Sequence, residues 1–236
     1  MIENTLSSLK ILGLYILPCV LVLLFLRFLY RPEQYVFRKL LHMVAFSCVT
    51  VMIYLSLDPY AAALACVLVT VILYPLLSFL ERYAWFQNLL VEKRAGEIKS
   101  SFVQLLLTAA SVILVSWGLL DRKDTAIAAV QMWGFGDEMA ALIGIPYGRH
   151  PLKGRFTDSR KTVEGSLAMF ISSFLVGVLL FCVIGKRSFY LSVILSLGAA
   201  FFGTVAEAVS KNGYDTVSVP LCMMSVLLLA ETVLDL

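Results

Sequence analysis

The sequence has little charge and few histidines, and these shortages limit what the protein can be. Only 15% of its 236 residues are charged, whereas 60% are hydrophobic. A soluble domain has about a quarter charged residues and about half apolar residues, so a soluble globular protein is excluded. The net charge of +3 gives no reason to expect nucleic-acid binding. The composition predicts an integral membrane protein, in which the positions of the charges matter more than their sum.

Cysteine chemistry is also poorly supported. The five cysteines all lie in apolar runs, none belongs to a C-x-x-C pair, and neither histidine stands at a metal-ligand spacing from them. These features argue against a disulfide framework and against a zinc site. We interpret the cysteines as small apolar packing residues. They are Cys19, Cys48, Cys66, Cys182 and Cys222.

The common nucleotide-binding and hydrolase motifs are missing. Gly185-Lys186 is followed by Arg187, so there is no P-loop. Gly134-Phe135-Gly136 lacks both the third glycine and the preceding strand of a dinucleotide-binding fold. No nucleophile-elbow serine and no H-E-x-x-H motif is present. Any nucleotide chemistry must therefore use another kind of site.

Long apolar runs fill the chain instead. A transmembrane helix needs about 20 apolar residues. The N-terminal run lacks a small-residue cleavage pattern, so we interpret it as the first membrane helix and not as a signal peptide. We predict an all-α fold, a single membrane domain over residues 1–236. About eight transmembrane helices are expected, near residues 9–29, 40–57, 59–80, 101–120, 124–145, 164–185, 188–208 and 216–235.

The basic residues predict the orientation of these helices. Most of the 19 lysines and arginines lie in the loops that follow the first, third, fifth and seventh predicted helices. The positive-inside rule places these loops in the cytoplasm and both termini outside. Residues 81–100, between the third and fourth helices, are interpreted as a connector at the membrane surface, with an interfacial amphipathic helix as the alternative.

Two adjacent acids, Asp137 and Glu138, lie inside the fifth predicted helix, just after Gly134 and Gly136. At 1.5 Å per residue they stand ~20 Å along that helix, in the cytoplasmic half of a ~30 Å membrane core. Because glycine weakens a helix, we predict a break here, with Asp137 capping a new helical segment that runs to Gly144. Polar groups at a break must line a cavity or be buried in protein. We therefore expect a half-buried site that opens to the cytoplasm.

The acid pair is followed by a cluster of cations. A charge deep in a membrane helix costs ~2.5–3.5 kcal/mol, so the acids need cations, a metal or water nearby, unless they only cap a helix at the water boundary. Magnesium suits carboxylate ligands, and arginine and lysine bind phosphate. The alternative for the cations is an ordinary cytoplasmic loop. They are Arg149, Lys153, Arg155, Arg160 and Lys161, with His150 among them.

Further candidates lie at the ends of other predicted helices. Glu164 opens the sixth helix beside Lys161, where free backbone N–H groups favour an anion. Glu207 and Asp215 flank the loop between the seventh and eighth helices, and each acid has an ordinary helix-end role as its alternative. The second helix adds Arg38, Lys39 and His42, for which packing within the membrane is the alternative. Acids suited to metal beside cations suited to polyphosphate predict nucleotide chemistry at a membrane surface.

Three short motifs carry a family resemblance. They are Gly136-Asp137-x-x-Ala140-Ala141-x-x-Gly144, Tyr147-Gly148-Arg149-His150 and Lys161-Thr162-Val163-Glu164-Gly165-Ser166, with weaker matches at Arg38-Lys39-x-x-His42, Glu207, Asp215 and Val219-Pro220. The pattern resembles the polytopic lipid-alcohol kinases: phytol kinase, dolichol or polyprenol kinase and CTP-dependent diacylglycerol kinase. Phosphatidate cytidylyltransferase is a more distant relative. The chain lacks the C-terminal histidine–glycine–glycine and paired-aspartate signature of the cytidylyltransferases, and this favours the kinases.

The resemblance implies phosphoryl transfer from CTP, or another nucleoside triphosphate, to the hydroxyl of a membrane lipid alcohol, with Mg²⁺. It makes Asp137 a nucleotide–metal residue whose turn is shaped by Gly136 and Gly144. Lys161 and Glu164 match the family's K-x-x-E-G element.

On this hypothesis magnesium bridges Asp137, together with Glu138 or Glu207, to the phosphates. Glu207 or Glu164 accepts the proton of the lipid hydroxyl. The triphosphate is neutralised by Arg149, His150, Lys153, Arg160 and Lys161. The alternatives are cytidylyl transfer, which releases pyrophosphate, and a transporter, in which acids also occur in broken helices.

Overall fold

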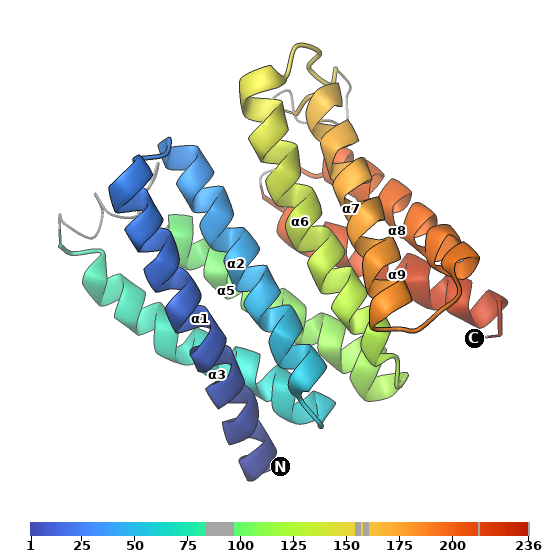
Figure 1. Ribbon diagram of the computed structural model, residues 1–236, viewed down its shortest axis with the longest axis horizontal. Coiled ribbons are helices and arrows are strands. Elements are labelled where there is room, and N and C mark those ends of the chain that lie inside the picture. The colour runs from blue at the N-terminus through green and yellow to red at the C-terminus, as the bar shows by residue number, and fades with distance from the viewer. Residues whose placement is uncertain (84–96, 154–156, 158–160, 212, 236) are drawn as a thin grey trace. The chain divides into compact units, whose positions relative to one another are not determined.

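A computed structural model describes residues 1–83, 97–153, 157, 161–211 and 213–235. Among these residues, the regular secondary structure is helical, and seven helices are long and apolar enough to cross a membrane. The prediction of an all-α bundle of about eight membrane helices is therefore confirmed. The elements, shown in Figure 1, are α1 (Ile2–Tyr30), α2 (Gln34–Leu55), α3 (Pro59–Leu80), α5 (Glu97–Val112), η1 (Ile113–Leu119), α6 (Lys123–Tyr147), α7 (Val163–Val183), α8 (Phe189–Val209) and α9 (Asp215–Val233).

The chain divides into two compact units, Met1–Leu114 and Val115–Leu236. In the first unit, α1 packs against α2 and α3, and α3 packs against α5. Part of its core is formed by Leu23 of α1 with Phe37 and Leu41 of α2. The predicted connector at residues 81–100 lies mostly outside the described residues, since only its two ends are described.

In the second unit, α6 packs against α7, α8 and α9, and α7 and α9 each pack against α8 (Figure 1). Residues 125–134 of α6 are all buried, so this stretch of the helix is enclosed by protein. Among the described helices of more than 18 residues, only α6 is too polar to be recognised as a membrane span from its hydropathy. The reason is its content of polar residues, which include Gln131, Asp137 and Glu138. An enclosed helix can carry such residues because protein, and not lipid, surrounds them.

The predicted break in this helix is wrong. α6 is continuous from Lys123 to Tyr147, so it passes through Gly134, Gly136 and Gly144 without interruption. The N–H of Gly148, which follows the helix, still donates to the carbonyl of Gly144, 3.1 Å away. Asp137 therefore lies inside a helix and does not cap a new one.

Two glycines of α6, Gly136 and Gly144, serve helix packing instead. A Cβ atom on Gly136 would collide with Oγ of Ser173 and lie 3.1 Å from Cγ of Met169, both on α7. A Cβ on Gly144 would lie 3.3 Å from the Cα of Gly165. Small residues let the backbones of membrane helices approach closely. The close contact between α6 and α7 thus explains these two glycines. Helix propensity alone does not reveal this contact.

A second feature of this unit is a buried polar network at the end of α7 where the chain turns into α8. Arg187 binds both Asp124 (2.8 Å) and Glu231 (2.5 Å), and Thr125 donates to the same Glu231 oxygen at 2.8 Å. The side chain of Glu231 is only 2% exposed. The network ties the start of α6, the α7–α8 connection and the end of α9 together.

Candidate functional site

The residue at the centre of the candidate site is Lys161, in the connection between α6 and α7. Its backbone is held by a short pairing of the two ends of that connection. The N–H of Leu152 donates to the Lys161 carbonyl (2.8 Å), and the N–H of Val163 donates to the His150 carbonyl (2.9 Å). One residue later, Thr162 caps α7 by accepting a hydrogen bond from the N–H of Gly165. This local pairing fixes where the lysine side chain begins.

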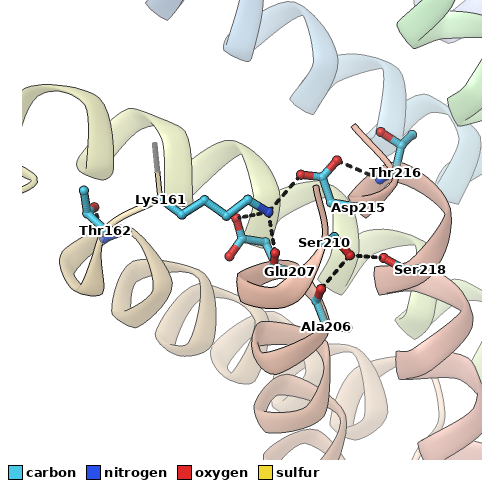
Figure 2. Close-up of polar contacts among 9 residues, drawn as sticks. Lys161, Thr162, Ala206, Glu207, Ser210, Asp215, Thr216 and Ser218 are labelled. Atoms are coloured by element: carbon cyan, nitrogen blue, oxygen red, sulfur yellow. Dashed lines mark hydrogen bonds and ion pairs between the residues drawn. The ribbon is translucent and has the colours of Figure 1, made fainter. Parts of the chain in front are cut away.

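The Lys161 ammonium lies between two carboxylates. Its Nζ is 2.9 Å from Oε1 of Glu207 and 3.1 Å from Oδ2 of Asp215, and it also donates to the backbone carbonyl of Glu207 (Figure 2). The lysine side chain is 14% exposed and that of Glu207 is 8% exposed. A single ammonium group therefore pairs with two carboxylates at a position that is largely shielded from water.

The turn between α8 and α9 brings these two acids together. Gly213 has φ +83°, a left-handed conformation that glycine adopts at little cost. Ser210 strengthens the turn, because its Oγ donates to the Ala206 carbonyl (2.7 Å) and pairs with Oγ of Ser218 at 2.5 Å (Figure 2). Asp215 is also oriented locally, since its Oδ1 accepts the N–H of Thr216 at 3.0 Å. Glu207 and Asp215 thus face one lysine from two successive helices.

Electrostatics keep this lysine charged. Burial by itself lowers the pKa of Lys161, but the nearby carboxylates of Glu207 and Asp215 outweigh that effect and raise the pKa above its usual value. Glu207 and Asp215 therefore share one positive charge.

Two other predicted residues, His150 and Glu164, form a pair beside this site. Nδ1 of His150 is 2.6 Å from Oε1 of Glu164, and the His150 N–H donates to Oε2 at 3.3 Å. The histidine side chain is 75% exposed, whereas Glu164 is mostly covered. Glu164 thereby fastens the α6–α7 connection to the first turn of α7.

The remaining predicted site residues are distributed as follows. Arg149 and Lys153 are exposed in the α6–α7 connection, and Glu138 is buried in α6. Neighbouring residues of a helix project about 100° apart, so Asp137 and Glu138 point in different directions. Arg155 and Arg160 lie outside the described residues. Arg38, Lys39 and His42 are on α2, in the first unit.

The carboxylates at Lys161 fit a magnesium ion that is shared with phosphates. Magnesium in proteins is held by one or two carboxylates together with substrate oxygens. Glu207 and Asp215 supply two carboxylates, and Oε2 of Glu207 is buried with no hydrogen-bond partner among the described residues. In the same part of the chain, no three acidic, histidine or cysteine side chains are grouped so as to hold a metal. The two carboxylates therefore fit a metal ion whose remaining ligands are water or substrate oxygens.

Comparison with known proteins adds one finding. The chain is similar to a phytol kinase. The alignment with that protein, from Synechocystis sp., spans 201 residues at 29% identity and covers 78% of this chain and 74% of the relative. No protein-family model and no solved structure matches the chain. The similarity supports a lipid kinase, and with the seven apolar helices it supports an integral membrane protein.

Proposed function

We propose that this protein is a membrane kinase that transfers the terminal phosphoryl group of a nucleoside triphosphate, CTP in the first instance, to the hydroxyl of an isoprenoid alcohol. The observation that carries the proposal is the largely buried cluster of Lys161, Glu207 and Asp215. The similarity to a phytol kinase supports the reaction class and the acceptor. The distribution of lysine and arginine supports a cytoplasmic position for the site.

In phosphoryl transfer, the protein mainly has to position the reactants and stabilise the charge on the phosphates. In the proposed site, Glu207 and Asp215 would hold magnesium, which when bound would neutralise charge on the phosphate oxygens. Asp137 stays a candidate ligand from the sequence. Lys161 and the exposed Arg149 and Lys153 bind those oxygens directly. Arg160 is proposed for the same role from the sequence. The helix N-terminus that Thr162 caps adds free N–H groups close to the anion.

The reaction itself is a simple exchange of bonds. The lipid oxygen forms a bond to the terminal phosphorus, the bond from that phosphorus to the β–γ bridging oxygen breaks, and CDP leaves with the electron pair. We assign the hydroxyl proton to the pair of His150 and Glu164, because Glu207 pairs with Lys161 in this structure and would serve as a metal ligand in the proposed site. When Nδ1 of His150 donates to Glu164, the other ring nitrogen is the basic one. Glu164 then acts as a positioning residue.

The decisive experiment is a product analysis. Purified protein in micelles is incubated with Mg²⁺, each γ-labelled nucleoside triphosphate in turn, and phytol, a polyprenol or diacylglycerol. A labelled lipid phosphate together with CDP is expected. Release of pyrophosphate would instead identify the cytidylyl-transfer alternative. Absence of labelled lipid with every donor and acceptor would overturn the proposal.

The proton assignment has its own test. His150→Asn keeps a polar side chain but removes the nitrogen that accepts the proton, so kcat should drop by about 10²-fold or more. Glu164→Gln should lower kcat less, because it disturbs only the orientation of the imidazole. If His150→Asn retains full kcat, another group takes the proton.

The transporter alternative has lost its structural basis. It depended on acids placed in a broken helix, a feature of secondary transporters. In this structure the acid-bearing helix α6 is continuous. Potential-driven flux without nucleotide is accordingly not expected.

A further inference from the structure

We propose that the ammonium group of Lys161 occupies the position of a divalent cation, and that binding of the metal displaces this lysine toward the phosphates. The inference rests on the proposed function, because it names how the same site takes up its metal. In the described structure, the two carboxylates of Glu207 and Asp215 share one ammonium ion. They form a cation site that the protein fills with its own side chain.

The charges of the site favour replacement of the Lys161 ammonium by a metal ion over binding of a metal ion beside it. Glu207 and Asp215 are two acids, and Lys161 supplies a single positive charge between them. A divalent ion balances more of this charge than an ammonium does. A lysine and a metal ion cannot occupy the same few ångströms between the carboxylates, because their charges repel. Metal binding therefore requires Lys161 to leave.

The exchange requires shorter distances between the cation and the carboxylate oxygens. The ammonium lies 2.9 and 3.1 Å from one oxygen of each acid, whereas magnesium binds oxygen at about 2.0–2.1 Å. The carboxylates must therefore draw closer, and Oε2 of Glu207, buried and unpartnered among the described residues, is a further oxygen already at hand. Both acids lie on α8 and α9, which the Gly213 turn joins.

Lys161 itself belongs to a different segment, the α6–α7 connection. Its backbone is held there by the hydrogen bond from Leu152, so only its long side chain has to move. Once released, the ammonium remains within side-chain reach of the same carboxylates. It would then meet the phosphates that arrive with the metal. Lys161 thus occupies the metal site when no metal is bound. It binds the nucleotide when the metal is present.

The test measures metal binding without nucleotide. Purified protein in micelles is titrated with Mn²⁺, and the free ion is followed by electron paramagnetic resonance. Lys161→Met removes the competing charge, and Mn²⁺ affinity should rise about tenfold or more, since one nearby charge shifts such equilibria by one to three decades. Lys161→Arg, which keeps the charge, should bind as the natural protein does. Lys10→Met, an exposed lysine of α1, is the matched control and should change nothing.

Two further variants keep the test decisive if Lys161→Met folds poorly. Asp215→Asn in the otherwise natural protein should weaken Mn²⁺ binding about tenfold or more, because it removes one of the two ligands. Lys161→Met combined with Glu207→Gln should lose the gain of the single variant. Unchanged affinity in folded Lys161→Met, or in Asp215→Asn, would overturn the inference while leaving the kinase proposal intact. Conversely, the absence of any lipid phosphate would remove the kinase proposal but not a measured competition between Lys161 and Mn²⁺.

Discussion

Lys161 and Glu207 are separated by 46 positions in the sequence, yet Nζ of the lysine lies 2.9 Å from Oε1 of the glutamate. Both side chains are largely buried, and Asp215 completes the contact at 3.1 Å. A buried ion pair of this kind is weak support for stability, because desolvation of the charges offsets their attraction. We therefore attribute this ion pair to function, because a buried cation and a buried anion can each be exchanged for a ligand.

The first prediction concerns Glu207. Glu207→Gln removes the charge that pairs with Lys161 but keeps the shape of the side chain. We expect kcat/KM for lipid phosphorylation to fall by about 10²-fold or more, as is typical when a preorganised charge in an active site is lost. The measurement is the steady-state rate with saturating Mg²⁺.

Glu33→Gln provides the matched control for this change, because Glu33 is exposed and makes no capping hydrogen bond at the start of α2. It should retain the natural rate. Full activity in Glu207→Gln would remove this residue from the site.

The second prediction concerns pH. The pKa of Lys161 is raised by Glu207 and Asp215 above its usual 10.5, so folding strengthens proton binding at this group. Its contribution to the free energy of unfolding is therefore complete below pH 10.5 and disappears as the pH rises through the higher folded-state pKa. The natural protein should lose stability more steeply above pH 10.5 than Lys161→Met does.

Between pH 6 and 9, Lys161 stays charged in both the folded and the unfolded chain, so the contribution of this group does not change with pH there. Denaturant titrations in micelles from pH 9 to above pH 10.5 give the comparison. An equal loss of stability in the two proteins above pH 10.5 would contradict the assignment of the raised pKa to Lys161.

The number and approximate extents of the helices followed from the sequence because an apolar run of about 20 residues is a strong local signal. The continuity of α6 did not follow. Gly136 lowers helix propensity, but its missing Cβ is what lets α7 approach, and a tertiary contact of this kind overrides propensity. Likewise, the loop charges identified Lys161 and Glu207 as candidates. No local pattern could state that they meet, because the meeting depends on how α7, α8 and α9 pack.

The network around Arg187 was missed, although the sequence holds a signal for it. Glu231 stands inside the last apolar run, and an ionisable residue at such a position calls for a partner. Its partners, Thr125 and Arg187, are 106 and 44 positions away. The sequence therefore indicates that Glu231 needs a partner, whereas only the fold shows which residues serve as that partner.

The third prediction tests the packing role of Gly136. Gly136→Ala places a methyl group against Oγ of Ser173, so we expect a loss of about 1–3 kcal/mol in the free energy of unfolding, as for other overpacked positions. Ser173→Ala should restore part of this loss when the two changes are combined. The measurement is a double-mutant cycle by denaturant titration in micelles.

The control for Gly136 is Gly13, in the interior of α1, where a Cβ would meet nothing within 4 Å. Gly13→Ala should be neutral or stabilising by up to about 1 kcal/mol, because alanine favours the helix. If Gly136→Ala behaves in the same way as Gly13→Ala, the close approach of α6 and α7 is not what requires glycine.

The fourth prediction separates stability from activity at the Arg187 network. Arg187→Ala leaves the charge of Glu231, whose side chain is 2% exposed, without its cation. Removing one partner of a buried pair costs about 3–5 kcal/mol, so the free energy of unfolding should fall by roughly that amount. The double variant with Glu231→Gln should recover a large part, because no uncompensated charge is left. Since Arg187 lies beyond the far end of α7 from Lys161, the folded fraction of either variant should keep its kcat. A loss of kcat in well-folded Arg187→Ala would instead make this network part of the catalytic machinery.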